Sequence, residues 1–261
     1  MHSLWFLFGA GLLAGTMNAL AGGGSFVTLP ALIAAGIPSV QANASSTVAL
    51  YPGGLASAWT YHAGGRRPGN GAVCGVALWR MVAVTLAGGL AGSLLLLRTP
   101  GSLFTLALPW LLLCATLALG FGPRIAATRR HSRRGAGGPG SARVLAAQFA
   151  LGVYGGYFGG AVGLMMVAAW SVLGEAEIKS LNGPRTLLVS AANTVAVAAF
   201  GLAGAVRWPE TLAVLAGGLL GGAAGARLGR RLPPRLTRRL TLACTAAVTG
   251  AFFLRAILRA G

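Results

Sequence analysis

A glycine-rich break with hydroxyl side chains is the first stretch of the chain whose residue types could bind a small ion. Gly22, Gly23 and Gly24 are followed by Ser25 and Thr28. Glycine lets backbone N–H groups approach a ligand closely, and a helix that starts there adds the positive end of its dipole. The two hydroxyls can donate further hydrogen bonds. The pattern suits a small anion, although glycine-rich stretches also allow helices to cross closely.

A second polar cluster occurs twice, near the start of a later apolar run in each half of the chain. Its members are Asn43, Ser45, Ser46 and Thr47 in the first half and Asn182, Arg185 and Thr186 in the second. Arg185 could bind a carboxylate or sulfonate through two hydrogen bonds, or mark the cytoplasmic edge of a membrane segment. Asparagine often caps helices, so capping and ligand contact both stay open for Asn43 and Asn182. Ser46 occupies the position that matches Arg185, so the predicted site is asymmetric.

Two asparagines lie inside otherwise apolar runs, where polar side chains usually face protein or a cavity. We include Asn18, which precedes the glycine break, among the predicted substrate-binding residues, and we expect Asn193 to make hydrogen bonds between helices. The histidines, cysteines and glutamates lack the spacing of a metal or catalytic site, and the chain has no aspartate. We therefore predict no enzyme, no cofactor and no metal site.

Composition places these residues in a membrane. Hydrophobic residues make up 55% of the 261 residues and charged residues only 9%, which excludes an ordinary soluble domain and indicates a lipid bilayer. The net charge is +18, but the arginines lie in short connections between apolar runs, so we expect no nucleic-acid partner. The tryptophans, Trp170 among them, lie near the ends of apolar runs and are predicted to anchor the protein at the membrane surface.

The chain also repeats itself. The segment 11–15 matches 152–156 at an offset of 141 positions, and 42–47 matches 181–186 at an offset of 139. Such a duplication in a hydrophobic chain is typical of transporters built from two homologous halves. We predict a first transmembrane repeat over 1–121, an Arg- and Gly-rich cytoplasmic linker over 122–143 and a second transmembrane repeat over 144–261.

Apolar runs long enough to cross a bilayer, about 17–25 residues, predict about eight segments in an all-α polytopic membrane protein. The runs are 4–21, 42–62, 72–97, 102–121, 144–174, 187–206, 211–226 and 240–258. The run 25–36 is too short to cross alone, and 144–174 is too long for one crossing. Each half is therefore expected to open with a broken or re-entrant helical hairpin, Leu4–Gly36 and Val144–Gly174, covered by protein or lining a cavity.

Charge predicts the orientation of these segments. Cytoplasmic loops carry an excess of arginine, and the Arg-rich segments 124–143 and 227–239 should both lie on that side. They do so if each half is a hairpin that returns to its starting side, followed by three full crossings. An odd number of crossings makes the halves inverted repeats in a cell membrane protein, with both termini outside the cytoplasm.

The residues around both breaks carry a resemblance to a known family. In the first half the motifs are 15–32, with Gly22-Gly23-Gly24-Ser25, then Gly36-Ile-Pro38 and 42–47. In the second half they are 155–159, leading to Asn182-Gly183. In order, spacing and duplication these motifs resemble the two repeats of the sulfite exporter TauE/SafE family, over nearly the whole chain. The resemblance implies a plasma-membrane secondary transporter of small anions, such as sulfite, sulfonates or related organic acids. It favours export over import.

Two other functions fit parts of the pattern. A channel-like anion pore would use the same helix ends without alternating access. A membrane partner or assembly subunit would use the Arg-rich loops instead, and the breaks would not matter. Glycine-rich faces such as 217–225 can pack within one protomer or between protomers, so a homo-oligomer stays open.

Overall fold

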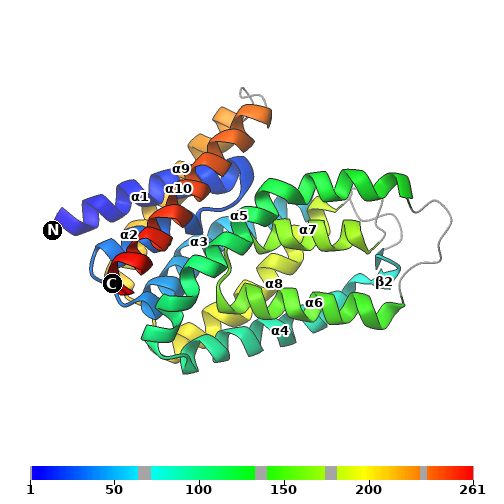
Figure 1. The fold of residues 1–261 in the computed structure, drawn as a ribbon, viewed down its shortest axis with the longest axis horizontal. Coiled ribbons are helices and arrows are strands. Elements are labelled where there is room, and N and C mark those ends of the chain that lie inside the picture. The colour runs from blue at the N-terminus through cyan, green and yellow to red at the C-terminus, as the bar shows by residue number, and fades with distance from the viewer. Residues whose placement is uncertain (1, 64–71, 133–139, 174–180, 230–233, 261) are drawn as a thin grey trace. The chain divides into compact units, whose positions relative to one another are not determined.

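The computed structural model describes residues 2–63, 72–132, 140–173, 181–229 and 234–260, and nearly all of them are helical (Figure 1). A bilayer offers no water to backbone N–H and C=O groups, and a helix pairs them within one segment. The helices are α1 (His2–Ala21), α2 (Ser25–Ala34), α3 (Ser39–Ala63), α4 (Leu78–Arg98), α5 (Gly101–Ser132), α6 (Ser141–Tyr157), α7 (Val162–Val172), α8 (Asn182–Leu202), α9 (Trp208–Gly229) and α10 (Pro234–Ala260).

Six of the described helices are long and apolar enough to cross a membrane, judged by length and composition. These spans are Ser3–Leu20, Leu78–Arg98, Gly101–Phe121, Asn182–Leu202, Trp208–Leu228 and Arg239–Leu258. The predicted all-α polytopic membrane fold is therefore confirmed in its helix content. The number of eight segments and the inversion of the halves stay predictions.

Each predicted half opens with a long helix, a break and a short helix. The first pair is α1 and α2, and the second is α6 and α7. The short helices contain 10 and 11 residues, whereas α1 contains 20 and qualifies as a full span. Helices α2 and α7 are thus short as expected, α1 is long enough for a full span, and the re-entrant course of the two hairpins stays a prediction.

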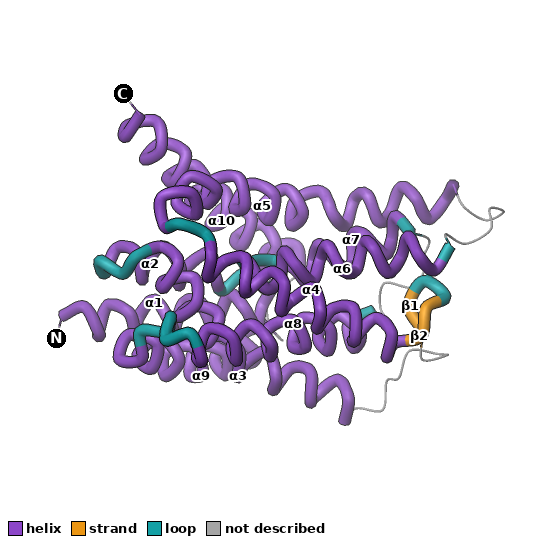
Figure 2. Tube along the Cα trace, turned by 90° about the horizontal axis from the view of Figure 1, so that it is seen from below, coloured by secondary structure: helices purple, strands orange, loops and turns teal. Residues whose placement is uncertain are grey.

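The predicted apolar segment 72–97 does not begin as a helix. Strands β1 (Ala72–Val73) and β2 (Val76–Ala77) pair antiparallel, and α4 begins only at Leu78 (Figure 2). Cys74 and Gly75 connect the strands with φ angles of 51° and 75°. Two consecutive positive φ angles are typical of a tight two-residue hairpin turn. Within the predicted linker 122–143, α5 continues to Ser132 and α6 begins at Ser141.

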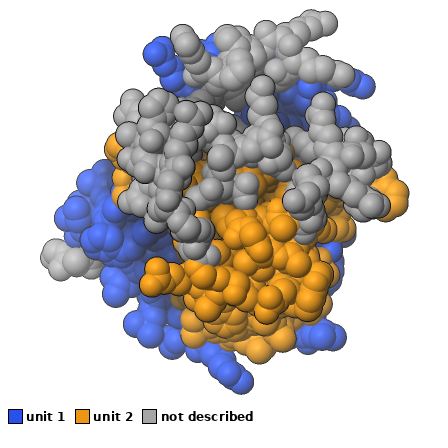
Figure 3. Space-filling view, turned by 90° about the vertical axis from the view of Figure 1, so that its right-hand side faces the viewer, with its two compact units in different colours: residues 1–53, 96–116, 200–261 blue, residues 54–95, 117–199 orange. Residues whose placement is uncertain are grey.

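The chain forms two compact units, and each takes helices from both predicted halves (Figure 3). The first unit contains 1–53, 96–116 and 200–261, and the second contains 54–95 and 117–199. Within the first unit α1 packs along α9 (Figure 1). Within the second, α6 packs along α4.

The glycines that allow these two packings occupy matching positions. A Cβ added to Gly15 would meet the backbone of Gly218 on α9, and one added to Gly156 would meet Gly89 on α4. Gly217 and Gly221 are packed against Phe8 and Leu12 in the same way as Gly88 and Gly92 against Phe149 and Val153. Small residues at such interfaces let two backbones approach closely. The same pairs of positions are therefore in contact in both units.

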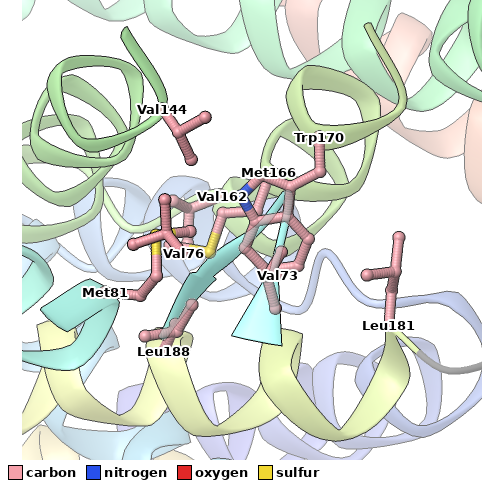
Figure 4. Packing of buried hydrophobic residues seen from close by; sticks show 9 residues of the cluster. All are labelled: Val73, Val76, Met81, Val144, Val162, Met166, Trp170, Leu181 and Leu188. Atoms are coloured by element: carbon pink, nitrogen blue, oxygen red, sulfur yellow. The ribbon is translucent and has the colours of Figure 1, made fainter. Parts of the chain in front are cut away.

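The core of the second unit surrounds the indole of Trp170 (Figure 4). Trp170 is buried, and its Nε1–H donates to Gln148 Oε1 at 3.0 Å, while Gln148 Nε2 donates to Thr85 Oγ1 at 2.8 Å. The expectation that Trp170 anchors the protein at the membrane surface is therefore wrong. Its hydrogen-bonded chain connects α7 to α6 and α4, and a buried chain of this kind fixes helix positions because each group would be costly to leave unpaired.

Gly15→Ala should destabilise the protein, whereas Gly9→Ala on the same helix should not. The added methyl of Gly15→Ala would lie against the backbone of Gly218 and 2.8 Å from Gly222 N, so α1 and α9 must separate, at a cost of roughly 1–3 kcal/mol. A Cβ at Gly9 meets nothing within 4 Å. The unfolding temperatures of the two purified variants in detergent measure this difference in stability. Equal unfolding temperatures would contradict the close packing of α1 on α9.

Candidate functional site

The first break is a glycine turn between α1 and α2. Gly22 and Gly23 have φ angles of 77° and 100°, values that residues with a side chain rarely adopt. The N–H of Gly22 donates to Asn18 O at 3.2 Å, and the N–H of Phe26 donates to Gly23 O at 3.0 Å. The helix ends here because glycine is the residue type that adopts these φ angles without strain.

Gly24 has a different role, because its φ of −54° is an ordinary helical value. A Cβ on Gly24 would lie 2.8 Å from Ala14 O on α1 and 3.3 Å from Leu50 Cδ1 on α3. Gly23 and Gly24 are both buried. The break is therefore held closely between α1 and α3, within the first unit.

One hydroxyl of the second polar cluster reaches the short helix of its own half. Thr28 on α2 and Ser46 on α3 are both buried, and their hydroxyls share a hydrogen bond. Thr28 Oγ1 also donates to Gly24 O at 3.3 Å. Ser45, the next residue on α3, accepts a hydrogen bond from the backbone N–H of Arg207 at 3.0 Å. The predicted break and the predicted cluster thus meet at Thr28 and Ser46.

The remaining predicted residues of the first half lie near this point. Asn43 is buried one turn inside α3, so it does not cap that helix, and Thr47 Oγ1 donates to its carbonyl at 3.0 Å. Ser25 is half-buried at the start of α2. Asn18 lies in the last turn of α1 with its Cβ 3.3 Å from the Cβ position of Gly24, but its side chain is exposed, contrary to expectation.

The second break contains a strained residue that sequence reasoning missed. Gly159 has a φ of 75°, and Ala161, directly before α7, has a φ of 56°. A left-handed conformation costs a non-glycine residue roughly 1–2 kcal/mol. Because alanine looks like an ordinary helix former, nothing in its type marks this position.

The second polar cluster also reaches the short helix of its own half. A Cβ on Gly163, in the first turn of α7, would lie 3.2 Å from Arg185 Cγ and 3.3 Å from Arg185 Cδ. The aliphatic part of Arg185 on α8 is thus packed at the start of α7. Asn182 is the first residue of α8, so capping and ligand contact stay open for it, and Thr186 Oγ1 donates to its carbonyl at 3.0 Å.

Both short helices begin without a side-chain cap. The residues at the N-caps of α2 and α7 are Gly24 and Ala161, and neither makes a side-chain hydrogen bond to its helix. The first N–H groups of a helix have no α-helical partner and carry partial positive charge. In these first turns the N–H groups of Val27 and Thr28 donate to Gly24 O, and those of Leu164 and Met165 donate to Ala161 O. An anion at either break would meet the positive end of the helix dipole, with hydroxyls nearby in the first half and a guanidinium nearby in the second. Among the described residues, no group of three or more His, Cys, Asp or Glu side chains could hold a metal ion.

Comparisons with known proteins agree with the fold. A family model described as sulfite exporter TauE/SafE matches residues 7–252. The probable membrane transporter protein ORF9 of Sinorhizobium sp is 29% identical over 225 residues, which cover 84% of this chain and 80% of that protein. The probable membrane transporter protein YfcA of Escherichia coli K12 is 30% identical over 218 residues, covering 83% and 77%. A probable membrane transporter protein of Haemophilus influenzae is 29% identical over 217 residues, covering 83% and 81%. No solved structure matches the chain.

Ala161→Gly should stabilise the protein by about 1 kcal/mol, because glycine adopts the left-handed conformation without the steric cost of a Cβ. Ala169→Gly, inside α7, is the matched control and should destabilise by about the same amount, because glycine is a poor residue in a helix interior. Thermal unfolding of the two variants gives the comparison. If both variants lose stability, Ala161 does not have a positive φ.

Proposed function

We propose that this chain, which belongs to the sulfite exporter TauE/SafE family and is a multi-pass membrane transporter, carries a small anion such as sulfite, a sulfonate or a related organic acid. The proposed mode is secondary transport by alternating access. The proposed direction is export.

One observation carries the proposal: both halves interrupt a helix and begin a short, uncapped helix directly afterwards. The N-caps Gly24 and Ala161 provide no side-chain acceptor to the first turns of α2 and α7. A small anion at this end is favoured by the helix dipole and by the N–H groups that precede those bonded to Gly24 O and Ala161 O. This binding needs no buried lysine or arginine in the first half.

The side chains around each break suggest their roles. At the first break we assign hydrogen-bond donation to Ser25 and to Thr28, whose proton turns from Gly24 O to the anion on binding while Ser46 donates to the Thr28 oxygen. At the second break we assign charge to Arg185, whose stem lies against Gly163. Asn18, Asn43, Thr47, Asn182 and Thr186 complete the proposed binding residues of the two clusters.

Eight segments and inverted halves form part of the proposal. Helices α4 and α5 and their counterparts α9 and α10 all qualify as spans. The other two pairs of matching long helices are α1 with α6 and α3 with α8. In these pairs α1 and α8 qualify as spans, whereas α6 has only 17 residues and α3 contains the first polar cluster. At 1.5 Å per residue, α2 and α7 reach only about half of a bilayer core of about 30 Å, which favours re-entrant hairpins.

Thr28→Val should lower transport more than Thr249→Val. Each threonine is buried in the first unit, donates to a carbonyl four residues earlier and shares a hydrogen bond with a hydroxyl on another helix. Thr249 lies on α10, away from the break. Loss of one hydrogen bond to a charged cargo, about 1.5–3 kcal/mol, predicts a fall in kcat/KM of about tenfold or more for Thr28→Val.

The measurement is uptake of radiolabelled sulfite, sulfoacetate and a sulfur-free carboxylate into proteoliposomes of known orientation. Saturable flux of one anion, reduced by Thr28→Val and retained by Thr249→Val, is the expected result. Fast flux that does not saturate would favour an anion pore. Absence of flux for every anion, with and without an imposed potential or pH gradient, would favour a partner subunit instead.

The proposed orientation predicts that both termini lie outside the cytoplasm. Alkaline phosphatase fused after the C-terminus should be active in cells, whereas green fluorescent protein at the same place should be dark. Fusions inserted between α5 and α6 should give the opposite pair of signals, because the Arg-rich segment there is proposed to be cytoplasmic. The same signals at both places would exclude this orientation.

A further inference from the structure

Two buried oxygens on α8 have no hydrogen-bond partner among the described residues. They are Ser190 Oγ and Asn193 Oδ1. The Ser190 side chain is only 5% exposed. Buried polar atoms are nearly always paired, because an unpaired one loses its bonds to water without replacement. Asn193 therefore does not use this oxygen for the expected bond between helices. Both oxygens are available to bind a ligand.

These two oxygens form a row on one helix face. Ser190 and Asn193 are three residues apart, which places them one above the other along α8, about 4.5 Å apart along its axis. The amide oxygen of Asn193 is an acceptor, and a hydroxyl oxygen such as Ser190 Oγ carries two acceptor lone pairs.

A glycine on α3 leaves room in front of Ser190. Both Gly54 and Ser190 belong to the second unit. A Cβ added to Gly54 would meet only Ser190 Oγ, at 3.9 Å, among atoms within 4 Å outside its own helix. The larger side chains of most residues would occupy this space, so the sequence keeps the side of Ser190 that faces α3 open.

The chemistry of the row selects a cation of low charge. Oxygen acceptors bind hard cations, and a divalent ion would need carboxylates for its charge. The whole chain contains only three acidic residues, all glutamates, and Glu210 lies in the first turn of α9. Glu210, at the start of α9, is the one carboxylate in the described spans, so a relay of several carboxylates cannot be built there, whereas neutral hydroxyl and amide oxygens are sufficient for Na⁺.

We propose that Ser190 and Asn193 bind a Na⁺ ion and that this ion is coupled to transport. The coupling rests on the proposed function, but the binding of Na⁺ does not. The site is separate from the breaks, since neither Ser190 nor Asn193 lies in the turns before α2 or α7. It gives the carrier a driving ion that requires no buried carboxylate.

The test is the unfolding temperature of the purified protein in NaCl and in choline chloride at equal concentration. Wild type should unfold at a higher temperature in NaCl, with a saturable dependence on Na⁺. Ser190→Ala should be as stable as wild type in choline, since it loses no hydrogen bond, and should need a Na⁺ concentration higher by about tenfold or more for the same effect. Asn193→Ala should behave in the same way.

Two further variants separate the site from general effects on folding. Ser171→Ala, in α7 of the same unit, removes a buried hydroxyl that donates to Val167 O at 2.8 Å and should retain the Na⁺ response. Gly54→Val keeps both oxygens but fills the space before Ser190, and should lose the response.

An unchanged Na⁺ response in Ser190→Ala and Asn193→Ala would overturn the proposal. Lower stability of Ser190→Ala in choline would overturn it too, because the hydroxyl would then already be paired. Stabilisation by sulfite alone, lost in the same variants, would assign the row to the anion instead. Na⁺ binding without any anion flux would refute the proposed function and leave the site standing, whereas anion flux without Na⁺ binding would do the reverse.

Discussion

The fold depends on one constraint: at membrane depth, the backbone must find its hydrogen-bond partners within the protein. A regular helix pairs its backbone groups within one segment, whereas the backbone at the two breaks needs partners from elsewhere in the protein. In the first break, Gly22 and Phe26 donate to Asn18 and Gly23, and the turn is covered by α1 and α3 of the same unit. No side chain caps α2 or α7, and the N–H groups of Val27 and Leu164 donate to the carbonyls of Gly24 and Ala161 instead. The positive ends of these two short helices are the physical basis of the binding site that we propose in a chain with so few charges.

Close packing of glycines supplies the cover around the breaks. Helix α1 of the first half packs on α9 of the second, and α6 of the second half packs on α4 of the first. In both pairs the same positions are in contact, with backbone against backbone. Each hairpin thus packs against a long helix from the other half. This exchange explains why the compact units do not coincide with the sequence repeats, and why neither half has a complete core of its own.

The sequence allowed prediction of features that depend on residue type alone. Consecutive glycines located the first break, and the duplication pointed to the second, because both are visible without knowledge of neighbours. Features that depend on partners were not predictable. Ala161 has a positive φ although alanine is ordinary in helices, and Trp170 is buried because Gln148, 22 positions earlier, pairs with its N–H. The strands before α4 were missed because an apolar run of this length looks alike in strand and helix.

The two halves share a backbone plan and differ in the side chains placed on it. Ser46 and Arg185 occupy matching positions, and each contacts the short helix of its own half, one through a hydroxyl and the other through an aliphatic stem. Gln148 and Thr85, which are hydrogen-bonded to each other, correspond to the buried apolar residues Leu7 and Val214. Both hairpins are held by directional bonds, but at different places. In the first, Thr16 Oγ1 on α1 donates to Gly221 O on α9 at 3.0 Å, and Thr28 on α2 is hydrogen-bonded to Ser46 on α3. In the second, the bonds connect the side chains of Trp170, Gln148 and Thr85 inside the core. The same backbone plan is therefore fixed by a different set of polar residues in each half.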